Sequence, residues 1–148
     1  MGAASHITVG GAPEGYDARL VLGEVSAREG PVIHVARDDK RMAAMAAALA
    51  FFAPDMPVIR FPGWDCLPYD RISPNAEISA ARMATLAGLV HGMPQRFVLL
   101  TTLNAATQRL PARDVLRESA FAAEVGQRID EKALRDFLVR MASCRPPP

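Results

Sequence analysis

The chain has 148 residues, half of them hydrophobic and 22% charged, which is the composition of an ordinary globular protein. Its 17 lysines and arginines are nearly balanced by 16 acidic residues, so it lacks the basic excess of a protein that binds nucleic acid chiefly by charge. The length is enough for one domain with a real core, or for one domain and part of a second.

The cysteines, histidines and apolar runs exclude several further classes. Cys66 and Cys144 lie far apart without a Cys-x-x-Cys partner and the histidines are isolated, so we expect no disulfide framework, no metal site and no cofactor. No apolar run approaches the ~18 residues of a transmembrane helix. The first residues also lack the basic and apolar regions of a secretory signal. These patterns predict a cytoplasmic protein that has no contact with a membrane.

Short apolar runs and helical patterns alternate over the first sixty residues. The predicted strands are residues 7–11, 31–36 and 57–61, of which the second fits a buried parallel sheet. The predicted helices are residues 17–27 and 38–53, with N-caps at Asp17 and Asp38. The positions expected to face inward are Leu20, Val21 and Val25 in the first helix and Met42, Met45, Ala46, Leu49 and Phe52 in the second.

The second half of the chain continues the alternation. A helix after residue 75 is predicted with Ser73 or Asn75 as its N-cap, and Arg82 on or beside its apolar stripe is expected to snorkel or to pair with a carboxylate. That stripe comprises Ile78, Ala81, Thr85, Leu86 and Leu89. The later predicted elements are a strand at 97–101, a short helix at 102–109 capped by Thr101 or Thr102, a strand or extended segment at 119–125, and a helix at 131–141 capped by Asp130.

Strands that alternate with helices predict an α/β fold, with a parallel sheet flanked by helices. A break at residues 111–118 divides the chain into a first domain, 1–115, and the start of a second small domain, 116–148. We expect the second part to be incomplete, because one strand and one helix cannot bury a core by themselves.

Residues 10–17 have the glycine spacing of a phosphate-binding loop. Gly10 and Gly15 occupy the two glycine positions, but Tyr16 stands where a lysine would reach the phosphates and Asp17 where a hydroxyl would bind Mg²⁺. Carboxylates at Glu14 and Asp17 would also repel phosphate oxygens. The alternative is a simple glycine turn before a helix. Under either interpretation, tight nucleotide binding is not expected here.

A proline-rich loop follows the strand at 57–61. In open α/β sheets, ligands and partners tend to lie where a strand ends at its carboxyl edge. The candidate interaction residues in and after the loop are Trp64, Asp65, Tyr69, Asp70, Arg71 and Arg82. Trp64 and Tyr69 could anchor or stack, while Arg71 and Arg82 could pair with carboxylate or phosphate. The alternative is an idle surface loop whose aromatic residues pack back onto the core.

An enzymatic interpretation of the same loop also stays open. Asp65, Asp70 and Tyr69 could serve as acid and base groups of a small α/β enzyme or nucleotide-binding domain. The missing phosphate-loop lysine, the absence of a nearby histidine or cysteine pair and the lack of metal-ligand spacing all weigh against it.

Three blocks of sequence, in the same order, resemble one known family. The run W-D-C-L-P-Y-D-R-I-S-P-N-A-E-I-S-A-A-R-M-A-T-L resembles the signature W-[DE]-x-L-P-Y-[DE]-x-x-S-P-…-R-[LM]-x-x-L near the N-terminus of the bacterial transcription-repair coupling factor, Mfd. V-L-L-T-T-L-N-A-A-T-Q-R-L-P at 98–111 and V-G-Q-R-I-D-E-K-A-L at 125–134 resemble the next two blocks of that family.

The resemblance implies an N-terminal module similar to the excision-repair protein UvrB, with a P-loop-NTPase or helicase-like fold and a decayed phosphate loop. Such a module binds UvrA by mimicking UvrB and packs against other Mfd domains to restrain them. The ATP-driven motor and the contacts with DNA and RNA polymerase belong to later domains of the family. The resemblance therefore implies no catalysis and no translocation on DNA by this chain.

The chain departs from the family pattern near its end. The resemblance implies that the main UvrA-contacting surface lies in a second subdomain, which starts near Phe121 and continues past residue 148. After Arg140 the family is expected to continue with a glycine and an aromatic residue, whereas this chain reads M-A-S-C-R-P-P-P. We therefore expect that surface to be truncated, and the resemblance assigns no UvrA-contacting residue here.

Overall fold

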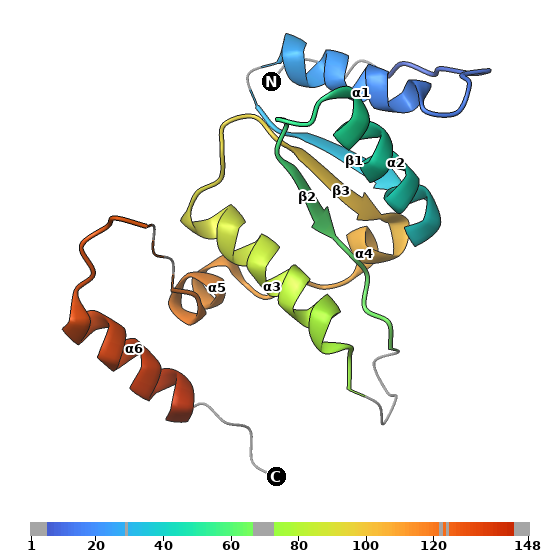
Figure 1. Cartoon of the computed structure of the whole chain (residues 1–148). Coiled ribbons are helices and arrows are strands. Elements are labelled where there is room, and N and C mark those ends of the chain that lie inside the picture. The colour runs from blue at the N-terminus through green and yellow to red at the C-terminus, as the bar shows by residue number, and fades with distance from the viewer. Residues whose placement is uncertain (1–5, 29, 67–72, 122, 124, 144–148) are drawn as a thin grey trace. The chain divides into compact units, whose positions relative to one another are not determined.

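A computed structural model describes residues 6–28, 30–66, 73–121, 123 and 125–143 (Figure 1). Its elements are α1 (Tyr16–Ala27), β1 (Val32–Ala36), α2 (Asp39–Phe52), β2 (Val58–Phe61), α3 (Ala76–His91), β3 (Val98–Thr102), α4 (Leu103–Thr107), α5 (Arg113–Ser119) and α6 (Glu131–Ser143). They form two compact units, unit 1 from Met1–Gly63 with Pro94–Thr107, and unit 2 from Trp64–Met93 with Gln108–Pro148.

Unit 1 contains a three-stranded sheet in the order β1-β3-β2, and β3 is parallel to both neighbours. Val98 in the central strand pairs with Val32 on one side and Val58 on the other. Parallel strands need long crossover connections, and α2 is part of the one that carries the chain from β1 to β2, on the other side of β3. The predicted parallel sheet flanked by helices is confirmed.

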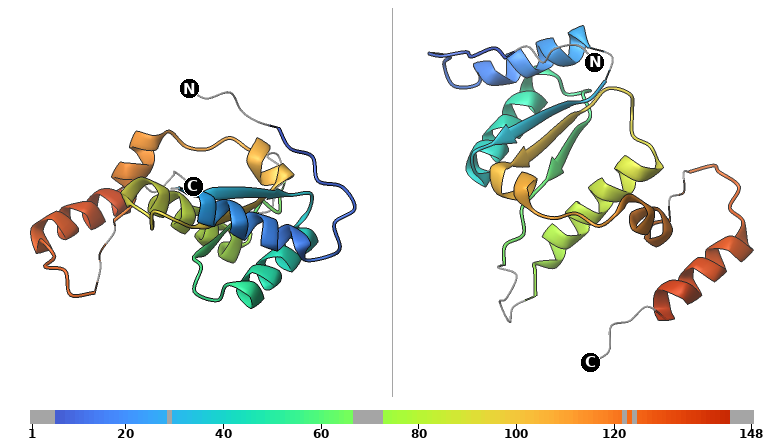
Figure 2. Two further views of the ribbon diagram at one scale, coloured as in Figure 1. Left: turned by 90° about the horizontal axis from the view of Figure 1, so that it is seen from above. Right: turned by 180° about the vertical axis from the view of Figure 1, so that it is seen from behind.

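The core of unit 1 lies between the sheet and the pair α1 and α2, which pack on each other and on the strands (Figure 2). Its fully buried centre is Val25 of α1, Leu49 of α2, and Val98 and Leu100 of β3. The predicted inward face of α2 is confirmed at Met42, Met45, Ala46 and Leu49. Phe52, the last predicted member, is 46% exposed because the helix ends there.

Three predictions in unit 1 are wrong. Residues 7–10 form no strand, and Ile7 is 76% exposed, because no neighbouring strand pairs with them among the residues described. Gly15, with φ at 84°, is the N-cap of α1, so Asp17 lies in the first turn, and Leu20, expected to face inward, is 37% exposed. The β1 strand is buried on one side only, since Ile33 and Val35 are exposed on this edge strand of the sheet.

Two predicted helix caps next to the sheet are confirmed. The Asp38 carboxylate accepts the backbone N–H of Arg41 at 2.8 Å, at the start of α2. The Thr102 hydroxyl accepts the backbone N–H of Ala105 at 3.2 Å, at the start of the short helix α4. In each case, the cap accepts a backbone N–H of the first helical turn, and that N–H has no acceptor within the helix.

Unit 2 is built around α3 and α5, which pack on each other. Asn75 caps α3 by accepting the Glu77 N–H at 2.8 Å, as predicted. Thr85 and Leu86 are buried as expected, but Leu89 is 39% exposed. Helix α5 occupies residues predicted as a break and as the start of a strand, and its buried Leu116 explains why a helix forms there.

The last helix, α6, has the predicted N-cap, because the Asp130 carboxylate accepts the N–H groups of Lys132 and Ala133. Its apolar side carries Phe137, whose ring lies 5.6 Å from that of Phe121, yet no residue of α6 is buried. Among the described residues, no helix is long and apolar enough to span a membrane, and no three potential metal ligands cluster together.

Candidate functional site

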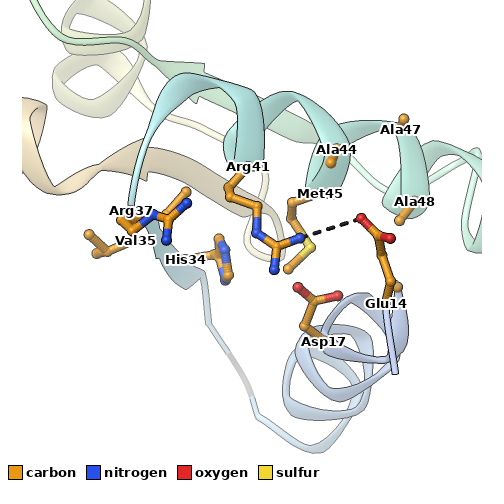
Figure 3. A pocket seen from close by; sticks show the side chains of 12 residues that line it. Glu14, Asp17, His34, Val35, Arg37, Arg41, Ala44, Met45, Ala47 and Ala48 are labelled. Carbon is orange, nitrogen blue, oxygen red and sulfur yellow. Dashed lines mark hydrogen bonds and ion pairs between the residues drawn. The ribbon is translucent and has the colours of Figure 1, made fainter. Parts of the chain in front are cut away.

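The glycine loop and the first turn of α1 form one wall of a hollow in unit 1. The hollow holds about 480 Å³, and its other walls are the carboxyl half of β1 and one side of α2 (Figure 3). Its charged or titratable lining residues are Glu14, Asp17, His34, Arg37 and Arg41. Alanines of α2 supply much of the apolar wall. Gly10 is exposed, and Gly15 and Asp17 line the hollow.

Acidic side chains occupy the mouth of this hollow at the start of α1. The Asp17 carboxylate accepts the N–H of Ala18, and Glu14 pairs with Arg41 of α2 at 3.4 Å. Both members of that ion pair are largely exposed, so its contribution to stability is small. Figure 3 shows Asp17, His34 and Arg41 pointing into the same space. The local charge is mixed, and the two arginines that line the hollow come from α2 (Arg41) and from the turn before it (Arg37), not from the glycine loop.

Burial lowers the pKa of His34 below its usual value, and the nearby charge of Asp17 partly offsets that effect. A folded-state pKa below that of the unfolded chain means that the neutral imidazole stabilises the fold. This stabilisation is complete above the unfolded pKa of 6.5 and is lost as the pH falls toward the lower folded value. His34→Gln is expected to remove this part of the acid sensitivity, measured by urea unfolding between about pH 7.5 and pH 5.5.

The matched variant is Asp17→Asn, which removes the charge and keeps the shape. It is expected to lower the pKa of His34 further, because the Asp17 carboxylate favours the imidazolium. Nuclear magnetic resonance titration of the imidazole measures this shift. An unchanged His34 pKa in the variant would contradict the placement of Asp17 beside it.

A second cluster lies in unit 2, at the start of the predicted interaction loop. The guanidinium of Arg82 lies over the ring of Trp64, 4.4 Å from its centroid. The backbone N–H of Trp64 donates to Gln108 Oε1 at 3.2 Å. The Asp65 carboxylate accepts the backbone N–H of Asn75 at 3.2 and 3.3 Å. Trp64 is half-buried and Asp65 is exposed, so both keep surface open to solvent.

Of the remaining predicted site residues, some lie outside the described part of the chain, and Tyr16 and Arg82 lie within it. Tyr69, Asp70 and Arg71 lie outside the described residues. Tyr16 is 44% exposed in the first turn of α1, where a phosphate loop would carry its lysine. Arg82 is only 1% exposed, so it neither snorkels nor presents its charge at the surface.

Sequence reasoning missed the contacts that organise both clusters. Gln108 binds the backbone of Trp64, but nothing in the sequence distinguishes it from other polar residues that follow a helix. Glu14 and Arg41 are 27 positions apart, so their spacing does not indicate an ion pair. The burial of Arg82 did have a signal, because it lies three residues before Thr85 and four before Leu86, both on the buried face of α3.

Comparison with known proteins gives a consistent result. No protein-family model matches the chain. The transcription-repair-coupling factor of Escherichia coli K12 is 31% identical over 125 residues, which cover 84% of this chain and 11% of the relative. That of Myxococcus xanthus is 34% identical over 140 residues, 88% of this chain and 11% of the relative. That of Haemophilus influenzae is 27% identical over 124 residues, again 84% of this chain and 11% of the relative.

The chain thus spans 11% of the length of each of these three relatives, and the alignments include most of both units. Over the residues that align, the chain belongs to the family of the transcription-repair coupling factor.

Proposed function

We propose that this chain is a non-catalytic, UvrB-like module of a transcription-repair coupling factor. It recruits the excision-repair protein UvrA and restrains the ATP-dependent DNA translocase of the parent protein. DNA and RNA polymerase are engaged by other parts of that protein. The module acts through protein contacts, without a bound nucleotide.

The observation that carries this proposal is the polarity of the glycine loop. A phosphate-binding loop needs a cation and free backbone donors at the start of its helix. Here Asp17 accepts a donor of the first turn and Glu14 holds the nearest arginine, Arg41, in an ion pair. A triphosphate would meet two carboxylates where it requires a lysine. The loop therefore favours a decayed nucleotide site over a working one.

The cluster around Trp64 supports a role in contacts. Trp64 is a half-buried aromatic residue fixed by neighbours at its ring and its backbone, which is the kind of anchor that dominates protein interfaces. Asp65 uses its carboxylate to hold the backbone at the start of α3. That structural task weighs against Asp65 as an acid or base group of an enzyme.

Binding in trans tests the proposal. The purified chain is titrated with UvrA and, separately, with the remainder of a coupling factor that lacks this module. Saturable binding to either protein is the expected result. Absence of binding to both, by a chain whose circular dichroism shows the α/β fold, would contradict a recruiting and restraining role.

A further inference from the structure

Arg82 is the largest of the fully buried side chains in the structure, at 1% exposure. It lies in the second turn of α3, between the cap at Asn75 and the buried pair Thr85 and Leu86. Its guanidinium covers the ring of Trp64, and burial lowers the pKa of Arg82 from its usual value. A charged side chain at such a position needs an explanation, because removing a charge from water is costly.

An apolar side chain of similar volume would fill the same space without that cost. The guanidinium offers what an alkyl chain lacks, a flat cationic group that stacks on an indole face. Such stacking is directional, so it fixes the plane of the ring as well as its distance. The side chain of Arg82 therefore holds Trp64 in one orientation.

Two further contacts hold the same short segment of backbone. Gln108 accepts the N–H of Trp64, and Asp65 accepts the N–H of Asn75. The ring of Trp64, its backbone and the next residue are thus each held by a different group. All of these residues belong to unit 2, so the described contacts around Trp64 lie within one compact unit.

We propose that Arg82 is a positioning residue, whose guanidinium sets the orientation of Trp64 and so presents it to the partner of the module. The partner-facing half of this proposal rests on the function proposed above, whereas the positioning of Trp64 does not. Arg82 acts on the partner only through Trp64, because Arg82 itself is 1% exposed.

The test uses the emission of Trp64, which is the single tryptophan of the chain. Arg82→Lys keeps the charge and the aliphatic stem but removes the planar group, and Arg82→Met also removes the charge. Arg113→Met makes the same change at an exposed arginine of unit 2, before the subdomain that starts near Phe121, and serves as the control. Both Arg82 variants are expected to shift the emission and increase quenching by acrylamide, whereas Arg113→Met is expected to match the wild-type chain.

A folded Arg82→Lys variant with wild-type emission and quenching would overturn the positioning role. A measurement on the unmodified chain keeps the test decisive if the variants do not fold. The δ protons of Arg82 are expected to show nuclear Overhauser effects to the indole and an upfield ring-current shift. Their absence would also overturn the proposal.

The second part of the proposal, that the orientation of Trp64 matters for binding, is tested by the affinity of the variants for UvrA or for the remainder of the coupling factor. Loss of an oriented stack is expected to weaken binding by Arg82→Lys about five- to thirtyfold relative to Arg113→Met. Wild-type affinity of Arg82→Lys, together with altered Trp64 emission, would overturn the link between orientation and binding. If Trp64→Ala also binds like the wild-type chain, the proposed contact surface fails, while the emission result still decides whether Arg82 positions Trp64.

Discussion

Leu49→Ala is expected to lower the free energy of unfolding by about 2–5 kcal/mol, the range observed when a buried leucine is truncated. Leu49 is fully buried in α2 and belongs to the core cluster with Val98 and Leu100 of the central strand. Truncation removes apolar contacts and leaves a cavity beneath the sheet. Urea unfolding followed by circular dichroism measures the change.

Phe51→Ala is the matched control, two residues away on the same helix. Phe51 is 81% exposed, so its truncation is expected to change the free energy of unfolding by no more than about 0.5 kcal/mol. The two variants share the same helix and the same assay, and they differ in how deeply the truncated side chain is buried. Equal losses in the two variants would mean that the face of α2 carrying Leu49 is not the one packed on the sheet.

Trp64→Ala is expected to weaken binding to the partner by about thirtyfold or more, which corresponds to the ~2 kcal/mol typical of an interface hot spot. The ring is half-buried and oriented by Arg82, so little freedom remains to be lost on binding. The affinity is measured by titration with UvrA and with the remainder of the coupling factor.

Val115→Ala provides the control for Trp64→Ala, since Val115 is another apolar residue of unit 2 and is 54% exposed on α5. It is expected to bind like the wild-type chain. If Trp64→Ala keeps wild-type affinity while the wild-type chain binds its partner, Trp64 is no part of the contact surface.

The elements with clear periodicity could be predicted from the sequence. The parallel strands β1, β2 and β3, the face of α2 from Met42 to Leu49 and the caps at Asp38, Asn75 and Asp130 each follow from local patterns. The positions of these strands and helices and the helix caps depend on neighbours within a few positions, where propensity and capping determine the outcome.

The features that the sequence did not predict share a physical cause, because each depends on contacts with distant parts of the chain. Residues 7–10 have the composition of a strand but no neighbour to pair with among the residues described. Helix α5 forms because Leu116 finds a buried site, although the local sequence indicates a break. The stacking of Arg82 on the ring of Trp64 joins residues 18 positions apart in the sequence. Sequence spacing alone cannot reveal such pairings.

The proposed module acts through protein contacts without a bound nucleotide. The most direct test of this property is a titration of the purified chain with a fluorescent adenosine triphosphate analogue and Mg²⁺. Carboxylates at Glu14 and Asp17 and the absent lysine are expected to leave no binding up to about 1 mM, weaker than the micromolar affinity of a working site. Displaceable binding in the micromolar range would contradict this result. It would identify the hollow between α1, β1 and α2 as a working nucleotide site.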